Sequence, residues 1–181
     1  MAIEKLLEAI EIRAIEDRDT AGMDKLLNDP YVAEWLGGAR SVKAVADAVS
    51  SGIEAWAEFG YGTLVAVDNT SNLLVGRAGV RPDLLNGVEE FELFYAVLPE
   101  FFGRNIATVL SYRALKGFFS ASQNPSVISY TLPANKGSIR VMEKLGFVYE
   151  RNFVHANLDH ICFRLQRAAL ILPSDCDACY L

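Results

Sequence analysis

Glu92 is the residue whose type and position best suit proton transfer. It is the last carboxylate before six apolar residues, 93–98, on what should be a central strand. A carboxylate in such a place is partly desolvated, so its pKa rises and it suits the role of general base. The alternative is that Glu92 lies on an exposed half of the sheet.

The segment that follows this strand has the residue types of a phosphate-binding turn. Residues 99–108 read Pro-Glu-Phe-Phe-Gly-Arg-Asn-Ile-Ala-Thr and join the strand to an amphipathic helix. The start of a helix offers unpaired N–H groups and the positive end of its dipole. Gly103 permits close backbone approach, Arg104 offers a fork of donors, and Asn105 adopts positive φ more readily than most residues. A single glycine is common at such turns, so the phosphate site needs support from elsewhere in the chain.

A second helix start, at Asn135, also carries polar groups. Residues 135–147 read Asn-Lys-Gly-Ser-Ile-Arg-Val-Met-Glu-Lys-Leu-Gly-Phe. Asn135 is typical of a helix N-cap, and Ser138 offers a hydroxyl whose simplest role is capping or solvation. Gly146 suits the left-handed position that ends a helix. One face of this helix is apolar, and another carries three stacked cations: Lys136, Arg140 and Lys144.

Charge is divided unevenly along the chain. The net charge of the 181 residues is -6, but residues 1–100 carry -10 and residues 101–151 carry +5. A basic segment in an acidic protein favours a local anionic ligand, whereas the overall charge disfavours nucleic acid.

Length and composition predict one cytoplasmic domain. At about 150 residues per domain, we expect a domain over residues 1–167 and a C-terminal appendage over 168–181. Apolar residues make up 51% of the chain and charged residues 22%, which is typical of a globular protein. No apolar run reaches the ~18 residues of a membrane span, and the N-terminus lacks the pattern of a signal peptide. We therefore expect no membrane partner.

Cysteine and histidine near the C-terminus raise the question of zinc. His160, Cys162, Cys176 and Cys179 are four possible ligands, and the last two have the spacing of a zinc site. Cys162, however, would point inward on a strand, as a small buried cysteine does. No strand–helix context surrounds the last pair, which disfavours a redox pair. We expect no metal.

Hydrophobic periodicity predicts a mixed sheet in an α/β (α+β) fold. Strands joined by short turns are antiparallel neighbours, and the later strands are separated by helices as in crossover units. The expected order is β-α-α-α-β-β-β-α-β-α-β-β. Its strands span 9–16, 62–68, 73–80, 89–98, 126–131, 147–155 and 160–165, and its helices 20–27, 31–36, 42–59, 104–119 and 135–145. A turn is expected at 81–83, running on through 86–87.

Three segments together resemble the Gcn5-related N-acetyltransferases (GNAT). Residues 92–108 resemble the "ElgY-l-pe-wGkGyAtE" block of that superfamily. Residues 135–147 resemble the "N-x-x-S-x-x-VMEKLGF" block of its ribosomal-protein alanine N-acetyltransferase branch, and residues 76–79 resemble that branch's "iGraGl" strand. The order of elements agrees from about Ile10 to Leu165, so the resemblance covers nearly all of the chain except its tail.

The resemblance implies the GNAT acyl-CoA N-acyltransferase fold and direct acetyl transfer from acetyl-CoA to a primary amine. The acceptor would be a protein N-terminus or, second, a small amine or antibiotic. Glu92 would deprotonate the amine, and Ser138 would hydrogen-bond the thiol leaving group. Pantetheine would contact Asn135 and the strand backbone, where a splayed strand leaves N–H groups free. The residues implied to bind the donor are Ala96, Val97, Leu98, Gly103, Arg104, Asn105, Ile106, Ala107, Thr108 and Asn135.

Two departures from the family pattern support an alternative. Glu100 and Asn105 replace the first and last residues of the Gln/Arg-x-x-Gly-x-Gly/Ala turn, and Met142 stands where many relatives have a general-acid tyrosine. A non-catalytic acyl-CoA-binding or regulatory module on the same fold is therefore the alternative. A nucleotide-binding protein is disfavoured, because neither GxGxxG nor a Walker sequence is present. The acidic first hundred residues favour a cationic acceptor, and a monomer and a homodimer both remain open.

Overall fold

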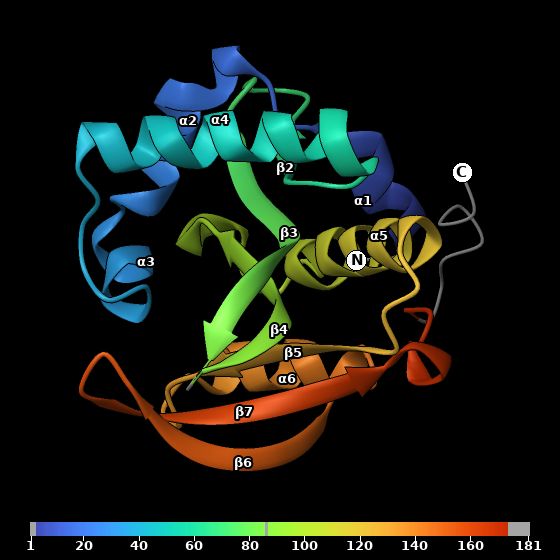
Figure 1. The fold of residues 1–181 in the computed structure, drawn as a ribbon. Helices are drawn as coiled ribbons and strands as arrows, with labels where there is room; N and C mark the ends of the chain where they lie inside the picture. The colour runs from blue at the N-terminus through green and yellow to red at the C-terminus, as the bar shows by residue number, and fades with distance from the viewer. Residues whose placement is uncertain (1–2, 86, 174–181) are drawn as a thin grey trace.

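The protein is built on one seven-stranded sheet in a computed structural model that describes residues 3–85 and 87–173 (Figure 1). The sheet order is β1-β2-β3-β4-β5-β7-β6. The strands are β1 (Ile10–Ala14), β2 (Leu64–Asp68), β3 (Leu74–Leu85), β4 (Val88–Val97), β5 (Ser126–Thr131), β6 (Val148–His155) and β7 (Leu158–Gln166). The helices are α1 (Ile3–Ala9), α2 (Thr20–Leu27), α3 (Pro30–Trp35), α4 (Val42–Phe59), α5 (Ile106–Ala121) and α6 (Lys136–Lys144), with short 3-10 turns η1 (Asp17–Asp19), η2 (Pro99–Phe101) and η3 (Arg167–Ala169).

The expected mixed sheet and the order of its strands and helices are confirmed from β1 onward, with two differences. A short helix, α1, precedes β1, where no element was expected, and its Leu6 is fully buried in the main core. Strand β3 also continues through the expected turn at Pro82, so its pairing with β4 runs to Leu85. Pro82 is tolerated because β2 pairs with β3 only as far as Ala78, beyond which β3 has a free edge.

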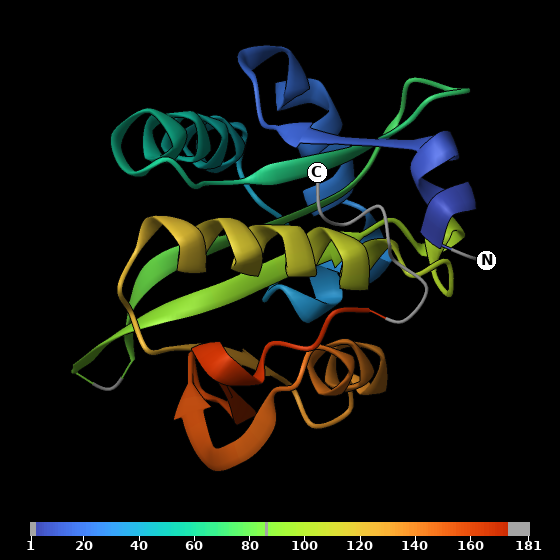
Figure 2. The ribbon, with the colours of Figure 1, turned by 90° about the vertical axis from the view of Figure 1, so that its right-hand side faces the viewer.

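Two hydrophobic layers cover the two faces of the sheet. Along β2, Leu64 and Ala66 pack with α5, whereas Val65 and Val67 pack with α2 and α4. This is the alternation expected of a strand buried on both faces. In Figure 2, α5 runs along the β3–β4 pair, and α4 lies on the other side of β2.

Strands β4 and β5 diverge soon after they meet. They run parallel and pair at one position only, Glu92 with Ile128. The hydroxyl of Ser129 then donates to the carbonyl of Leu93 at 2.9 Å, which spans the start of the gap. Beyond Leu93, no strand among the described residues pairs with this edge of β4.

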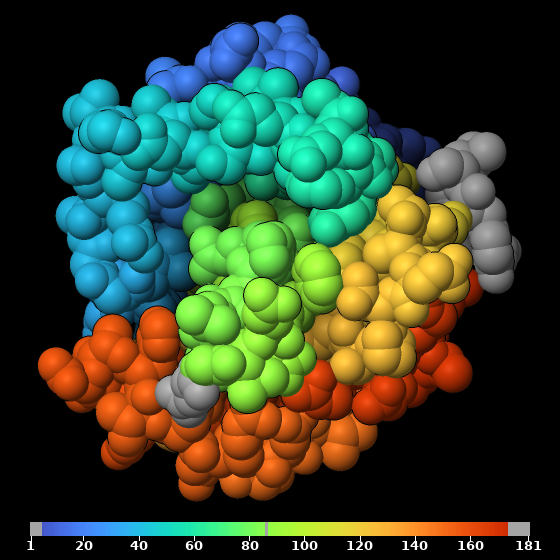
Figure 3. Space-filling view, in the orientation of Figure 1, coloured from blue at the N-terminus to red at the C-terminus, as the bar shows by residue number. Residues whose placement is uncertain are grey.

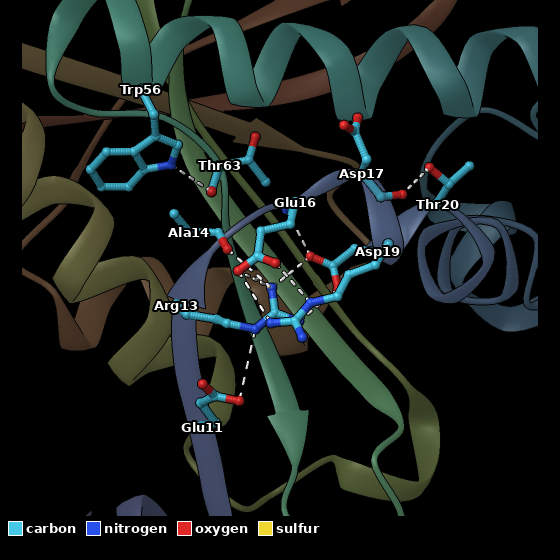
Figure 4. Close-up of polar contacts among 10 residues, drawn as sticks. Glu11, Arg13, Ala14, Glu16, Asp17, Asp19, Thr20, Trp56 and Thr63 are labelled. Atoms are coloured by element: carbon cyan, nitrogen blue, oxygen red, sulfur yellow. Dashed lines mark hydrogen bonds and ion pairs between the residues drawn. The ribbon is translucent and has the colours of Figure 1, made fainter.

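An ion-pair network ties the helical layer to β1 (Figure 4). Both terminal nitrogens of Arg13 donate to the carboxylate of Asp19 at 2.7 Å, and the Glu16 N–H donates to the same carboxylate at 2.8 Å. Burial raises the pKa of Asp19, but the Arg13 hydrogen bonds, the Glu16 N–H and the charges of Arg13 and Arg18 together outweigh it and lower that pKa. Trp56 of α4 donates to the Thr63 carbonyl at 2.8 Å, which fixes α4 over the sheet.

Residues 168–173, the start of the expected appendage, lie against the end of α6. The Ile171 N–H donates to the Leu145 carbonyl at 3.1 Å, and Leu170 and Leu172 pack on the main core. Cys176 and Cys179 lie outside the described residues, and Cys162 is a buried free cysteine. Within the described ranges, no group of three or more His, Cys, Asp or Glu side chains could hold a metal ion, and no helix is long and apolar enough to cross a membrane.

Candidate active site

Glu92 is buried at the point where β4 and β5 separate. Its side chain is 8% exposed, so the expectation of a desolvated carboxylate is confirmed and the exposed alternative is wrong. Arg81, opposite it on β3, places two nitrogens 2.8 and 2.7 Å from its Oε2. Burial raises the pKa of Glu92, and the charge and hydrogen bond of Arg81 oppose part of that rise. Glu92 is thus a carboxylate with a raised pKa at the mouth of the gap.

Sequence reasoning missed two arginines that share the face of Glu92. Arg77, Gly79 and Arg81 alternate along β3 and therefore point to one face, which is also the face of Glu92 and Phe94 on β4. The guanidinium of Arg77 lies 5.0 Å from the centre of the Phe94 ring, and that of Arg81 lies 5.2 Å from it. The signal available in the sequence was the spacing of the two arginines around Gly79, at i and i+4 of a strand.

Aromatic side chains lie beside this charged face on the next strands. The Tyr130 hydroxyl of β5 donates to Asp83 at 3.3 Å. Its ring lies 5.3 to 5.6 Å from three rings of the β6–β7 hairpin, those of Phe153, His155 and His160. Figure 3 shows the surface hollowed between the α3–α4 side of the molecule and the β3–β4 pair.

The backbone of β4 is only partly free at the gap. Leu98 donates its N–H to the Val75 carbonyl at 2.8 Å, and Ala96 pairs with Arg77, so these two residues bond to β3. Of the three residues along which the resemblance places pantetheine, Ala96 and Leu98 are therefore paired with β3. Because backbone groups alternate in direction along an antiparallel strand, the N–H of Val97 points away from β3 and into the gap.

The turn before α5 has the geometry of an anion site. Gly103 and Asn105 have φ of 72° and 64°, as their residue types allow, and α5 begins at Ile106, two residues later than expected. No side chain caps this helix within the described residues, so the first N–H groups, those of Ile106, Ala107 and Thr108, are left for a ligand.

Side chains around this turn add positive charge to it. Lys144, at the end of α6, donates to the side-chain oxygen of Asn105 at 3.0 Å. The guanidinium of Arg104 donates to the Glu100 carbonyl at 3.1 Å and lies 4.8 Å from the centre of the Phe101 ring. The turn thus joins two cations to an open helix N-terminus.

Ser138 of α6 contacts strand β4 on the face opposite to that of Glu92. Its hydroxyl lies 2.7 Å from the Tyr95 hydroxyl, which also contacts the Ser138 carbonyl at 2.9 Å. Asn135 caps α6 by accepting from the Ser138 N–H at 3.0 Å, as expected. Tyr95 and Glu92 are three residues apart on β4, so they lie on opposite faces of the strand.

Tyr95 is a third residue that sequence reasoning missed, although it stands within the matched block. Burial raises its pKa, so its hydroxyl stays protonated and can serve as a donor. Met142, where the resemblance places a general-acid tyrosine in many relatives, is fully buried in the core and has no proton to donate.

Comparison with known proteins agrees with this geometry. The family described as the acetyltransferase (GNAT) domain matches residues 9–148. A Bacillus subtilis protein, the uncharacterized YkkB, is 27% identical over 145 residues, which cover 80% of this chain and 84% of that protein.

Solved structures share the fold at lower identity. The ribosomal-protein-S5-alanine acetyltransferase from Vibrio fischeri superposes with a TM-score of 0.74 at 18% identity, covering 91% of this chain and 96% of that one. The Salmonella typhimurium protein yncA, determined with acetyl-CoA, gives a TM-score of 0.69 at 21% identity over 93% of this chain and 99% of that one. The chain described here belongs to the GNAT acetyltransferase family.

Proposed function

We propose that the protein is an N-acetyltransferase that moves the acetyl group of acetyl-CoA directly to a primary amine. The observation that carries this proposal is the position of Glu92, a buried carboxylate with a raised pKa where β4 and β5 part. Membership of the GNAT family supports the same reaction.

The residues present fit acetyl-CoA. Its pyrophosphate would accept from the open N–H groups of Ile106 to Thr108, close to Lys144. Its pantetheine amides would pair with the free edge of β4 at Val97 and with the side-chain amide of Asn135. The bound donor supplies an acetyl group activated as a thioester.

Glu92 would act on the attacking amine, and Ser138 would act on the departing sulfur. Glu92, directly or through one water, takes the proton of the substrate ammonium and so frees the nitrogen lone pair. As the nitrogen bonds to the acetyl carbon and the carbon–sulfur bond breaks, the Ser138 hydroxyl donates to the departing sulfur. Tyr95, whose hydroxyl lies 2.7 Å from that of Ser138, orients the Ser138 hydroxyl toward the sulfur. The proton that the nitrogen loses as the amide forms is taken up by the departing thiolate, which leaves as CoA.

Two acceptor classes fit this chemistry. The fold shared with the ribosomal-protein-S5-alanine acetyltransferase supports a protein N-terminus. A small amine is the other class, and the charges that surround Glu92 bear on the choice between them.

Substitution of Glu92 separates an enzyme from a binding module. Acetyl-CoA is titrated calorimetrically into the wild-type protein and Glu92→Gln, and CoA release is then followed with a panel of amines. We expect equal donor affinity and release of CoA by the wild type alone. Glu89→Gln, at an exposed position of the same strand, is the matched control and should retain activity. Donor binding without CoA release from any amine would favour the non-catalytic module.

A further inference from the structure

One arginine on the face of Glu92, Arg77, forms no ion pair within the described residues. We propose that the acceptor is a small primary amine that carries an anionic group, a carboxylate or a phosphate, bound by Arg77 and Arg81. This inference rests on the proposed function and narrows its substrate class.

The register of β3 and β4 places both arginines next to the base. Arg81 stands directly opposite Glu92, and Gly79 stands opposite Phe94. Arg77 lies four residues along β3 from Arg81 on the same face, and the Phe94 ring lies beside both guanidinium groups. An anion bound by the arginines therefore shares the face of Glu92. This arrangement suits an amine and an anion in one small molecule.

Gly79 makes this arrangement possible. A Cβ at Gly79 would lie 2.6 Å from the Cζ atom of Phe94, so only glycine lets the ring lie across β3 at that point. The ring then lies within 5.0 and 5.2 Å of the two guanidinium carbons. Contact with an aromatic face holds each cation in place although the two repel each other.

Charge compensation on this face is incomplete. Glu92 neutralises Arg81, whereas Arg77 has no carboxylate partner within the described residues, and its Nε is buried without a hydrogen-bond acceptor there. Burial, Arg81 and Arg40 lower the pKa of Arg77 to about 10, and Glu92 alone opposes them. A buried cation left without a partner is costly. A bound anion would supply the missing partner.

The local charge therefore opposes the charge of the surrounding chain. The net charge of -10 over residues 1–100 favours a cationic acceptor, but Arg77 is approached by two cations, Arg40 and Arg81. The carboxylates of this face, Glu92 and Asp83, interact with Arg81. Short-range contacts decide which ligand fits, because charges beyond about 8 Å are screened at physiological salt. A protein N-terminus supplies the amine without a fixed anionic group beside it.

Paired acceptors test the proposal on the full-length chain. O-phosphoethanolamine is compared with ethanolamine, and β-alanine with propylamine, while putrescine and an alanyl peptide represent the cationic and protein-like classes. We expect kcat/KM to be about 10- to 100-fold higher for the anionic member of each pair, as charge-assisted hydrogen bonds allow. The phosphate and carboxylate pairs together show which anion the site prefers. Equal or better turnover of the neutral, cationic or peptide acceptors would overturn the inference while leaving the acetyltransferase intact.

Variants locate the preference at Arg77. In Arg77→Met the ratio of anionic to neutral kcat/KM should fall toward one, and Arg77→Lys should restore part of it. Arg18→Met, at an exposed arginine outside the site, is the control and should keep the ratio. An unchanged ratio in Arg77→Met would show that Arg77 has a purely structural role.

A binding measurement keeps the inference separate from the proposed reaction. With CoA bound, O-phosphoethanolamine or β-alanine should raise the thermal midpoint of the wild-type protein more than that of Arg77→Met. If no amine is acetylated but this difference appears, the anion site stands and the reaction fails. If neither anionic amine stabilises the wild-type protein, the anion site is excluded.

Discussion

Two partly buried arginines have opposite surroundings in this molecule. Arg13 gives both terminal nitrogens to Asp19 and lies within 3.8 Å of two further carboxylates, those of Glu11 and Glu16 (Figure 4). Arg77 contacts the Phe94 ring and, within the described residues, forms no ion pair. The first region is complete without a ligand and holds the fold. The second region, around Arg77, contains a positioned cation without an anionic partner, which is the arrangement expected of an anion-binding site.

The largest expected effect is on kcat/KM, and it should distinguish Glu92 of the second region from Asp19 of the first. Glu92→Gln should lower kcat/KM by about 10²- to 10⁴-fold, the usual contribution of a general base, with little loss of stability. Asp19→Asn should do the reverse, because it leaves Arg13 without its bidentate partner but touches no reacting group. Steady-state kinetics and urea unfolding of both variants check this, and a large loss of kcat/KM in folded Asp19→Asn would break the comparison.

The arginines themselves should differ in what they contribute to stability. Arg13→Met should lower the free energy of unfolding by about 3 kcal/mol, because it leaves a buried carboxylate uncompensated. Arg77→Met removes a cation that has no carboxylate partner, so it should leave that free energy unchanged or raise it. Urea unfolding measures both, and equal destabilisation would show that the two sites are structural alike.

Most strands and helices could be predicted from local sequence patterns, but the residues that surround Glu92 could not. The strands and helices from β1 to β7 were predicted because apolar periodicity and turn residues are local signals. Asn105 was likewise expected to accept positive φ, and does so at 64°. The pairing of Arg81 with Glu92 depends on the register of β3 and β4, which the expected turn at Pro82 concealed.

The same limit explains the other misses at the site. Tyr95 meets Ser138 across 43 residues of sequence, a contact that no local pattern reports. The imbalance at Arg77 was hidden by the acidic balance of the first hundred residues, since a sum of charges carries no information about which side chains share a face.

Gly79 provides a smaller and more specific perturbation of the second region. Gly79→Ala should displace the Phe94 ring, lower the preference for anionic amines and cost about 1–3 kcal/mol of unfolding free energy through overpacking. Gly117→Ala, in α5 with nothing within 4 Å of the added methyl, is the matched control and should stabilise the protein by about 0.5–1 kcal/mol. If Gly79→Ala kept the full anionic preference, the Phe94 ring would not be what positions the arginines.

The hydroxyl pair on the other face of β4 should give a modest kinetic effect. Tyr95→Phe and Ser138→Ala should each lower kcat by about tenfold, and the double variant should lose little more, because the two hydroxyls act in series. KM for acetyl-CoA should change less than kcat. Fully multiplicative losses would mean that the two groups act independently.

The smallest effect is the pH dependence of stability, which should have opposite signs in the two regions. The pKa of Asp19 is lowered by folding, so its contribution is present above the unfolded pKa and is lost as pH falls through the folded value. The pKa of Glu92 is raised, so the folded state holds its proton longer and stability falls as pH rises from the unfolded pKa through the folded one. The free energy of unfolding is measured with urea at several pH values. Asp19→Asn should remove a contribution that increases with pH, and Glu92→Gln should remove one that decreases with pH.

The most direct test of the account is to identify the products of one reaction. Acetyl-CoA and O-phosphoethanolamine or β-alanine are incubated with the wild-type protein, and CoA and the N-acetylated amine are quantified by mass spectrometry. The account predicts equal amounts of the two products with the wild type and almost none with Glu92→Gln. Failure to form an N-acetylated product from these amines, with acetyl-CoA bound, would contradict it.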